Sequence, residues 1–176
     1  TLPANLESSD GLLNIQLEHQ GQQEAISRAI PIVLNKIDLQ FFPEGGDLIG
    51  GLPARVAFKA VNEFGKPADV EGQLFDEKGA LLTTFSSFHD GMGAFNFAPR
   101  ADGRYIVRLT KPVVLEKEYH LPTVQAMGYR LHIQKQDSTG LYVDVAATQP
   151  GIVYLAGSSR DKLFFFTEIT VGNITQ

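Results

Sequence analysis

The stretch IDLQFFPEGGDLIGG (residues 37–51) opens the region that decides the fold class, which runs to residue 109. Apolar residues alternate with polar ones along residues 37–41 and again along 55–60, as half-buried strands require. Gly, Pro and Asp clusters separate these runs at intervals of about 8–12 residues, the spacing typical of β-sandwiches. The sequence therefore predicts an all-β protein in which residues 36–112 form one complete β-sandwich.

The flanks have the same pattern but are too short to form sandwiches of their own. In residues 1–35, Leu13, Ile15 and Leu17 share one face of a predicted strand, and a return strand over 25–33 contains Pro31, which suits an edge. A lone hairpin is marginal in water, so we interpret it as the terminal strands of a preceding sandwich.

Residues 117–176 contain a further set of alternating runs, around residues 129–133, 141–145, 152–156 and 163–171. This is about half of the roughly 100 residues of a full sandwich, so we expect a second, incomplete sandwich. The overall prediction is a tandem array of immunoglobulin/fibronectin-like modules. We also expect hairpin 12–33 to pack against strands 141–171, within one chain or between two, since each would cover apolar surface of the other.

Composition excludes several classes of function. Lys and Arg number 15 against 20 Asp and Glu, giving a net charge of −5, which argues against a nucleic-acid surface. There is no cysteine, so disulfides, thiolate zinc sites and cysteine nucleophiles are excluded, as suits a bacterial exported protein. No apolar run is long enough for a transmembrane helix. The chain starts at Thr1 rather than at a methionine, so we expect a processed or excised piece of a longer protein.

Motifs for catalysis are missing. The glycines in GDLIGG (residues 46–51) are followed by Leu52 and Pro53 instead of the Lys of a phosphate loop. GSSR (residues 157–160) lacks the second glycine of a nucleophile elbow. The four histidines are not spaced as a helical zinc pair, and we expect them to be solvated: His19, His89, His120 and His132. The sequence therefore predicts no catalytic, cofactor-binding or metal residue, and no cofactor.

Several features leave two interpretations open. Asp47, Asp90 and Asp102 lie in predicted loops, where they are calcium ligands or, as we favour, turn residues. Tyr105 is either a tyrosine corner or, as we favour, an ordinary core tyrosine. The run LFFF (residues 163–166) places apolar side chains on both faces of a strand, so both need cover, from a neighbouring module or a ligand.

Residues 36–110 resemble the macroglobulin-type (alpha-2-macroglobulin-like) β-sandwich domains of large exported bacterial proteins, many from Bacteroidetes. The segments that carry the resemblance are DLQFFPEGGDL (residues 38–48), RVAFKA (55–60), GKP (65–67) and HDGMG (89–93) with Phe95. The resemblance implies a scaffolding module without catalytic residues. Some parents of such domains carry a Cys-Gly-Glu-Gln thioester, which a chain without cysteine lacks. Other parents resemble outer-membrane systems for nutrient uptake.

Together these observations favour a non-enzymatic structural or interaction segment of a larger exported protein, located in the periplasm, at the outer membrane or on the cell surface. Its partners would be neighbouring domains of the same polypeptide. The alternative is a ligand-binding module for glycan or peptide, with exposed aromatics on one sheet face: Tyr119, Tyr129, Tyr142 and Tyr154. The chain has no tryptophan, the favoured sugar platform.

Overall fold

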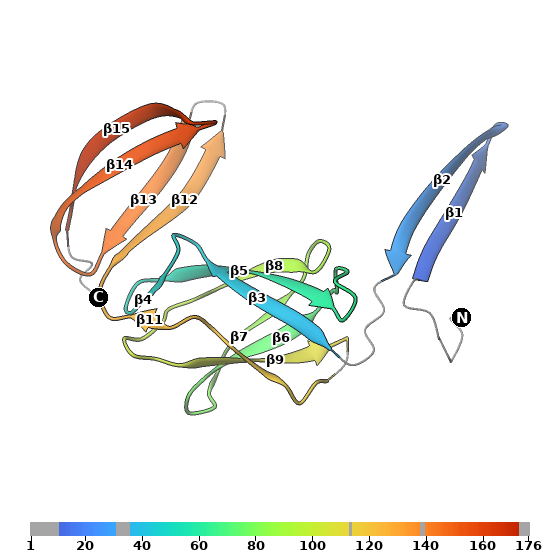
Figure 1. The fold of residues 1–176 in the computed structure, drawn as a ribbon, viewed down its shortest axis with the longest axis horizontal. Coiled ribbons are helices and arrows are strands. Elements are labelled where there is room, and N and C mark those ends of the chain that lie inside the picture. The colour runs from blue at the N-terminus through green and yellow to red at the C-terminus, as the bar shows by residue number, and fades with distance from the viewer. Residues whose placement is uncertain (1–10, 31–35, 113, 138–139, 173–176) are drawn as a thin grey trace.

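The computed structural model describes residues 11–30, 36–112, 114–137 and 140–172, and in these ranges the protein is all-β without a helix (Figure 1). It follows that the described residues contain no helix of the length and apolarity needed to cross a membrane. The strands are β1 (Gly11–His19), β2 (Gln22–Ile30), β3 (Ile37–Pro43), β4 (Leu48–Ile49), β5 (Ala54–Asn62), β6 (Glu71–Asp76), β7 (Leu81–Ser86), β8 (Met92–Phe97), β9 (Tyr105–Lys111), β10 (Glu118–His120), β11 (Val124–Gln125), β12 (Tyr129–Asp137), β13 (Gly140–Ala147), β14 (Gly151–Ser159) and β15 (Lys162–Val171).

Residues 37–125 form what we call the central unit, in which two antiparallel sheets share one core. One sheet has the order β3-β5-β8 and the other β10-β9-β6-β7, while β4 and β11 form a short parallel pair at one end. The alternation in β5 has the expected result, because Val56, Phe58 and Ala60 are buried while the residues between them face outward. Side chains from both sheets make up the main core cluster, and a smaller cluster joins Ile49 and Leu52 to Ala146 of β13.

Aromatic rings fill the middle of this core, and glycines make room for them. The Phe85 ring lies 4.8 Å from that of Phe58 and 5.0 Å from that of Phe95, centroid to centroid. Gly72 pairs with Phe85 across strands β6 and β7, and a Cβ at Gly72 would lie 2.4 Å from the Phe85 ring. Such close packing leaves no space for even one added methyl group.

The core extends beyond residue 112, where the sequence pattern placed the end of the complete module. Strand β10 pairs with β9, and the buried Tyr119 hydroxyl donates a hydrogen bond to the Ile37 carbonyl at 2.9 Å. Leu121 and Val124 belong to the same core cluster. The segment that the sequence analysis divided between a link and a second module therefore closes the central unit.

Tyr105 has the geometry of a tyrosine corner, so the interpretation as an ordinary core tyrosine was wrong. Its ring is buried at the start of β9, and its hydroxyl accepts a hydrogen bond from the Arg100 backbone N–H at 2.7 Å. A Cβ at Gly103 would lie 2.5 Å from that hydroxyl. The glycine two residues before the tyrosine therefore makes the corner possible.

Outside the central unit, the strands of the described residues pair as separate hairpins. β1 pairs with β2, β12 with β13, and β14 with β15. Many of their apolar side chains are exposed, including all four residues of the run 163–166, whereas Ala146, Ala147 and Val171 are buried. Figure 1 shows the β1–β2 hairpin at one end of the central unit and strands β12–β15 at the other. The expected packing of hairpin 12–33 against strands 141–171 within one chain is therefore wrong; residues 31–33 of that hairpin lie outside the described residues.

Candidate functional site

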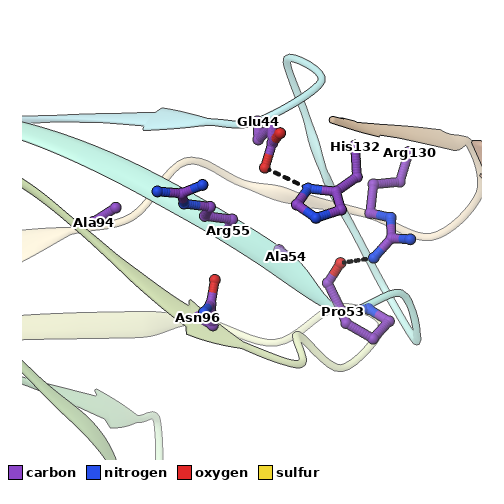
Figure 2. A pocket seen from close by; sticks show the side chains of 8 residues that line it. All are labelled: Glu44, Pro53, Ala54, Arg55, Ala94, Asn96, Arg130 and His132. Carbon is purple, nitrogen blue, oxygen red and sulfur yellow. Dashed lines mark hydrogen bonds and ion pairs between the residues drawn. The ribbon is translucent and has the colours of Figure 1, made fainter. Parts of the chain in front are cut away.

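A polar hollow that is lined by several charged side chains lies where β12 joins the central unit. Figure 2 shows how its side chains lie. They come from the loop after β3, from β5 with the residue before it, from β8 and from β12. The lining residues are Glu44, Pro53, Ala54, Arg55, Ala94, Asn96, Arg130 and His132.

Glu44 is the acceptor at the centre of this hollow. Its backbone N–H donates to the Arg55 carbonyl at 2.8 Å, which fixes the start of the loop after β3. One carboxylate oxygen lies 2.8 Å from His132 Nδ1, and the other accepts from the Ile133 backbone N–H at 3.2 Å. Gly45 follows with φ +87°, and a Cβ there would lie 3.1 Å from the Leu131 backbone. The loop after β3 therefore contacts β12 through both the Glu44 side chain and the Gly45 backbone.

Arg130 makes a second connection between the same two parts. Its guanidinium donates from Nη1 to the Pro53 carbonyl at 2.9 Å and from Nη2 to the Asp144 carboxylate on β13. The Arg130 side chain is mostly buried, and Asp144 is partly so. Pro53 belongs to the central unit, so one side chain ties that unit to both strands of the β12–β13 hairpin.

The electrostatics of the hollow favour an ionised Glu44. Burial by itself raises the pKa of this carboxyl group. The hydrogen bonds from His132 and the Ile133 N–H, together with the nearby imidazole of His132 and guanidinium of Arg55, outweigh burial and leave the pKa of Glu44 below its ordinary value. Glu44 is therefore held as a carboxylate between two basic side chains.

The side chains of the hollow connect the β12–β13 hairpin to the central unit. Asp144 lies opposite His132 in the β12–β13 register, but its carboxylate is the acceptor for Arg130. Glu44 is thus the carboxylate that is hydrogen-bonded to His132, and the Arg130 guanidinium bonds to Pro53 and Asp144.

The three aspartates considered for calcium are not brought together. Asp90 and Asp102 have φ values of 45° and 61°, and each occupies a turn. Asp47 is an exposed residue of the loop before β4. In the described parts of the chain, no three His, Asp or Glu side chains form a group that could hold a metal ion.

The other sequence motifs occupy structural positions. Residues 46–51 lead into β4, whose two side chains are buried, and a Cβ at Gly50 would lie 2.6 Å from the Ala101 backbone. Residues 157–160 end β14 and begin its turn. His19, His89 and His120 are exposed, whereas His132 is half-buried against Glu44 and is not the solvated histidine that we expected.

The four tyrosines of the ligand hypothesis do not form one platform. Tyr119 is buried in the central core, contrary to expectation. Tyr129, Tyr142 and Tyr154 are exposed, on three different strands. Tyr154 stacks on Phe166 of the neighbouring strand, with ring centroids 5.5 Å apart.

A shallow apolar groove crosses the outer face of the β3-β5-β8 sheet. Its floor consists of small residues of β5 and β8, and Phe42, Phe88 and Met92 form exposed walls. Arg55 and Lys59 lie along it. The groove shares Glu44, Arg55 and Ala94 with the polar hollow, so the two surfaces are continuous.

Sequence reasoning singled out neither Glu44 nor Arg130. Glu44 was seen only as part of a strand break, yet a glutamate between a proline and two glycines occupies a fixed loop that can aim a carboxylate. Its partner His132 is 88 positions away, and no local pattern connects them. Searches with this chain match no family model, no curated protein and no solved structure.

Proposed function

We propose that this chain is a non-enzymatic structural segment of a larger exported or cell-envelope protein. In this proposal the central unit is an immunoglobulin-like β-sandwich of the macroglobulin type, and it holds the next module in a fixed position. The observation that carries the proposal is the junction itself. Glu44 and Arg130 use their hydrogen bonds to bind β12 and the central unit together.

Two further observations support this proposal. The strands outside the central unit repeat its hairpin pattern, as expected of modules in series. The resemblance of residues 36–110 to macroglobulin-type domains and the absence of cysteine favour an exported bacterial parent. Function would then lie in the spacing and presentation of neighbouring modules.

The test is a distance measurement across the junction. Because the chain has no cysteine, Lys78→Cys and Ser159→Cys place spin labels at two unique exposed sites, the turn after β6 on the central unit and the end of β14 beyond the junction. Double electron–electron resonance should give a narrow distance distribution that broadens with Glu44→Gln or Arg130→Met. Glu118→Gln is the matched control, because it removes an exposed ion pair with Arg108 away from the junction. A broad distribution in the otherwise unchanged chain would overturn the proposal.

The apolar groove favours a second candidate function, the binding of an extended peptide. Exposed Phe42, Phe88 and Met92 offer contacts for apolar side chains, and Arg55 and Lys59 offer cations for acidic ones. Strand β3 has an unpaired edge beside this face, where a peptide strand can add. Peptides selected from a random display library on the immobilised chain should be acidic and aromatic, and should lose binding with Phe88→Ser but not with Phe164→Ser. Selection of no such peptides would count against this candidate.

A further inference from the structure

Strands β12–β15 repeat the first half of the central unit. In the central unit, β3 pairs with β5 and β6 with β7, and beyond the junction β12 pairs with β13 and β14 with β15. The β6–β7 and β14–β15 hairpins each carry a bulge, after Leu74 and after Gly157. In the central unit, β5 also pairs with β8 and β6 with β9. The corresponding edges of β13 and β14 have no strand partner in the described residues.

The β1–β2 hairpin repeats the end of the central unit. DGLLNIQL (residues 10–17) matches DGRYIVRL (residues 102–109), with Asp-Gly first and apolar residues at the same three positions. IPIV (residues 30–33) likewise matches LPTV (residues 121–124). The direction of pairing agrees, because β1–β2 and β9–β10 are both antiparallel, although their registers differ by two residues: Glu118 is opposite Arg108, whereas the matching Ser27 is opposite Asn14. β1 is thus the counterpart of β9, and β2 that of β10.

Burial is the property in which the two counterparts differ. In β9, Tyr105, Val107 and Leu109 are 4%, 0% and 2% exposed, because β6 and the opposite sheet cover them. In β1, the matching Leu13, Ile15 and Leu17 are 47%, 45% and 51% exposed. The second edge of β9 pairs with β6, whereas β1 pairs only with β2. β1 therefore has a free edge and exposed apolar side chains at the place where its counterpart β9 is covered by β6.

We propose that β1 of one copy of this chain pairs with the open edge of β14 of a second copy, so that the β1–β2 hairpin covers strands β12–β15. Aligning the two bulges makes Leu155 the counterpart of Gly72. Gly72 pairs with Leu109, the counterpart of Leu17. The assembled strands then run antiparallel, with Leu17 beside Leu155. The inference rests on the proposal that the chain is a series of repeated modules, but it does not need a fixed junction.

The placement of the two surfaces determines the form of the assembly. The β1–β2 hairpin and strands β12–β15 lie at opposite ends of the central unit in Figure 1, so the hairpin does not cover the strands of its own chain in this structure. Two different surfaces then meet at every contact, and such head-to-tail contacts extend into open chains unless the rotation closes a ring. The edge of β13 stays open in this assembly, since β1–β2 has no counterpart of β8.

The first experiment measures the mass of the full chain by light scattering over a range of concentrations. We expect oligomers that grow with concentration, and at least tenfold weaker association for Ile15→Asp. Asn14→Asp is the matched control, because Asn14 pairs with Ser27 on the polar face of the same hairpin and should leave association unchanged. An unchanged thermal unfolding midpoint would show that each variant keeps the central unit. A monomer at all concentrations, or equal association of Ile15→Asp and the parent chain, would overturn the proposal.

The second experiment uses the absence of cysteine to fix the register. Leu17→Cys protein mixed with Leu155→Cys protein should form a mixed disulfide on mild oxidation. Leu17→Cys mixed with Tyr154→Cys should not, because Tyr154 lies on the outer face of β14. Equal cross-linking of the two mixtures would contradict the assigned faces. The mixtures can cross-link even if the junction proves loose, so this result and that of the spin-label measurement are independent.

Discussion

The central unit and strands β12–β15 begin with the same two hairpins but differ in what covers them. In the central unit, β8 and β9 extend the two sheets and the apolar sides meet in one core. Beyond the junction no counterparts of β8 and β9 are present in the described residues, and Ile152, Tyr154 and Phe166 remain exposed. The difference teaches that alternation is enough to specify a strand, whereas stability depends on the strands that cover it.

The largest expected effect is a loss of unfolding free energy when a side chain in the core of the central unit is removed. Phe58→Ala removes a ring that is buried against Phe85 and should cost about 3–5 kcal/mol of unfolding free energy. Phe164→Ala removes an equally large ring from exposed surface and should change stability by less than about 0.5 kcal/mol. Urea unfolding followed by circular dichroism, at a concentration where the chain is monomeric, measures both. Similar losses would show that the two regions are equally well covered.

A smaller difference should separate two glycines that share one backbone conformation. Gly91 in the central unit has φ +72° and Gly21 in the β1–β2 turn has φ +76°. Alanine at either position incurs about 1–2 kcal/mol of left-handed strain. A Cβ at Gly91 would also lie 2.3 Å from the Ala60 carbonyl oxygen, whereas nothing lies within 4 Å at Gly21. Gly91→Ala should therefore be the more destabilising by a further 1–3 kcal/mol or so, and equal midpoints in urea would contradict the close approach.

The tyrosine corner should contribute about as much as one buried hydrogen bond. Tyr105→Phe keeps the ring but leaves the Arg100 N–H without its acceptor, which should cost about 1 kcal/mol. Tyr154→Phe makes the same change beyond the junction and should not affect stability, since the Tyr154 side chain is exposed. Urea unfolding compares the stabilities of the two variants. If Tyr105→Phe left the unfolding free energy unchanged, the hydrogen bond of the tyrosine corner would serve only to orient the ring.

The sequence predicted the long strands well because their alternation reports burial directly. Val56, Phe58 and Ala60 were assigned to the core face, and all three are buried. The short strands β4, β10 and β11 have two or three residues, too few to show a period, so none was predicted. Without β10, Tyr119 looked like a residue of another module, although its hydroxyl anchors the carbonyl of Ile37.

The junction could not be predicted from the sequence because its residues meet only in the folded chain. Glu44 and His132 belong to segments that were assigned to different modules, and each alone resembles a solvent-exposed polar residue. The hairpins outside the central unit, in contrast, could be predicted in part from the sequence. Their incomplete strand sets were visible in the sequence, but only the strand pairing shows which edges are open.

The smallest effect concerns pH at the junction that connects the covered region to the uncovered one. The pKa of Glu44 is lower in the folded chain than its ordinary value, which is that expected in the unfolded chain. The bonds of its carboxylate to His132 and Ile133 therefore stabilise the junction fully above the ordinary pKa value of 4.5, and this contribution is lost as pH falls through the depressed folded value. The spin-label distance between positions 78 and 159 should stay narrow from neutral pH to about pH 5 and broaden at lower pH.

Glu44→Gln supplies the control for this pH dependence. An uncharged amide has no proton to gain, so the distance distribution of this variant should be broader at neutral pH and should lack the broadening below pH 4 that we assign to Glu44. If acid broadened the distributions of the parent and Glu44→Gln chains by the same amount, the transition would belong to other carboxylates. The junction would then depend mainly on Arg130, which bridges Pro53 and Asp144. Arg130→Met should in that case broaden the neutral-pH distribution more than Glu44→Gln does.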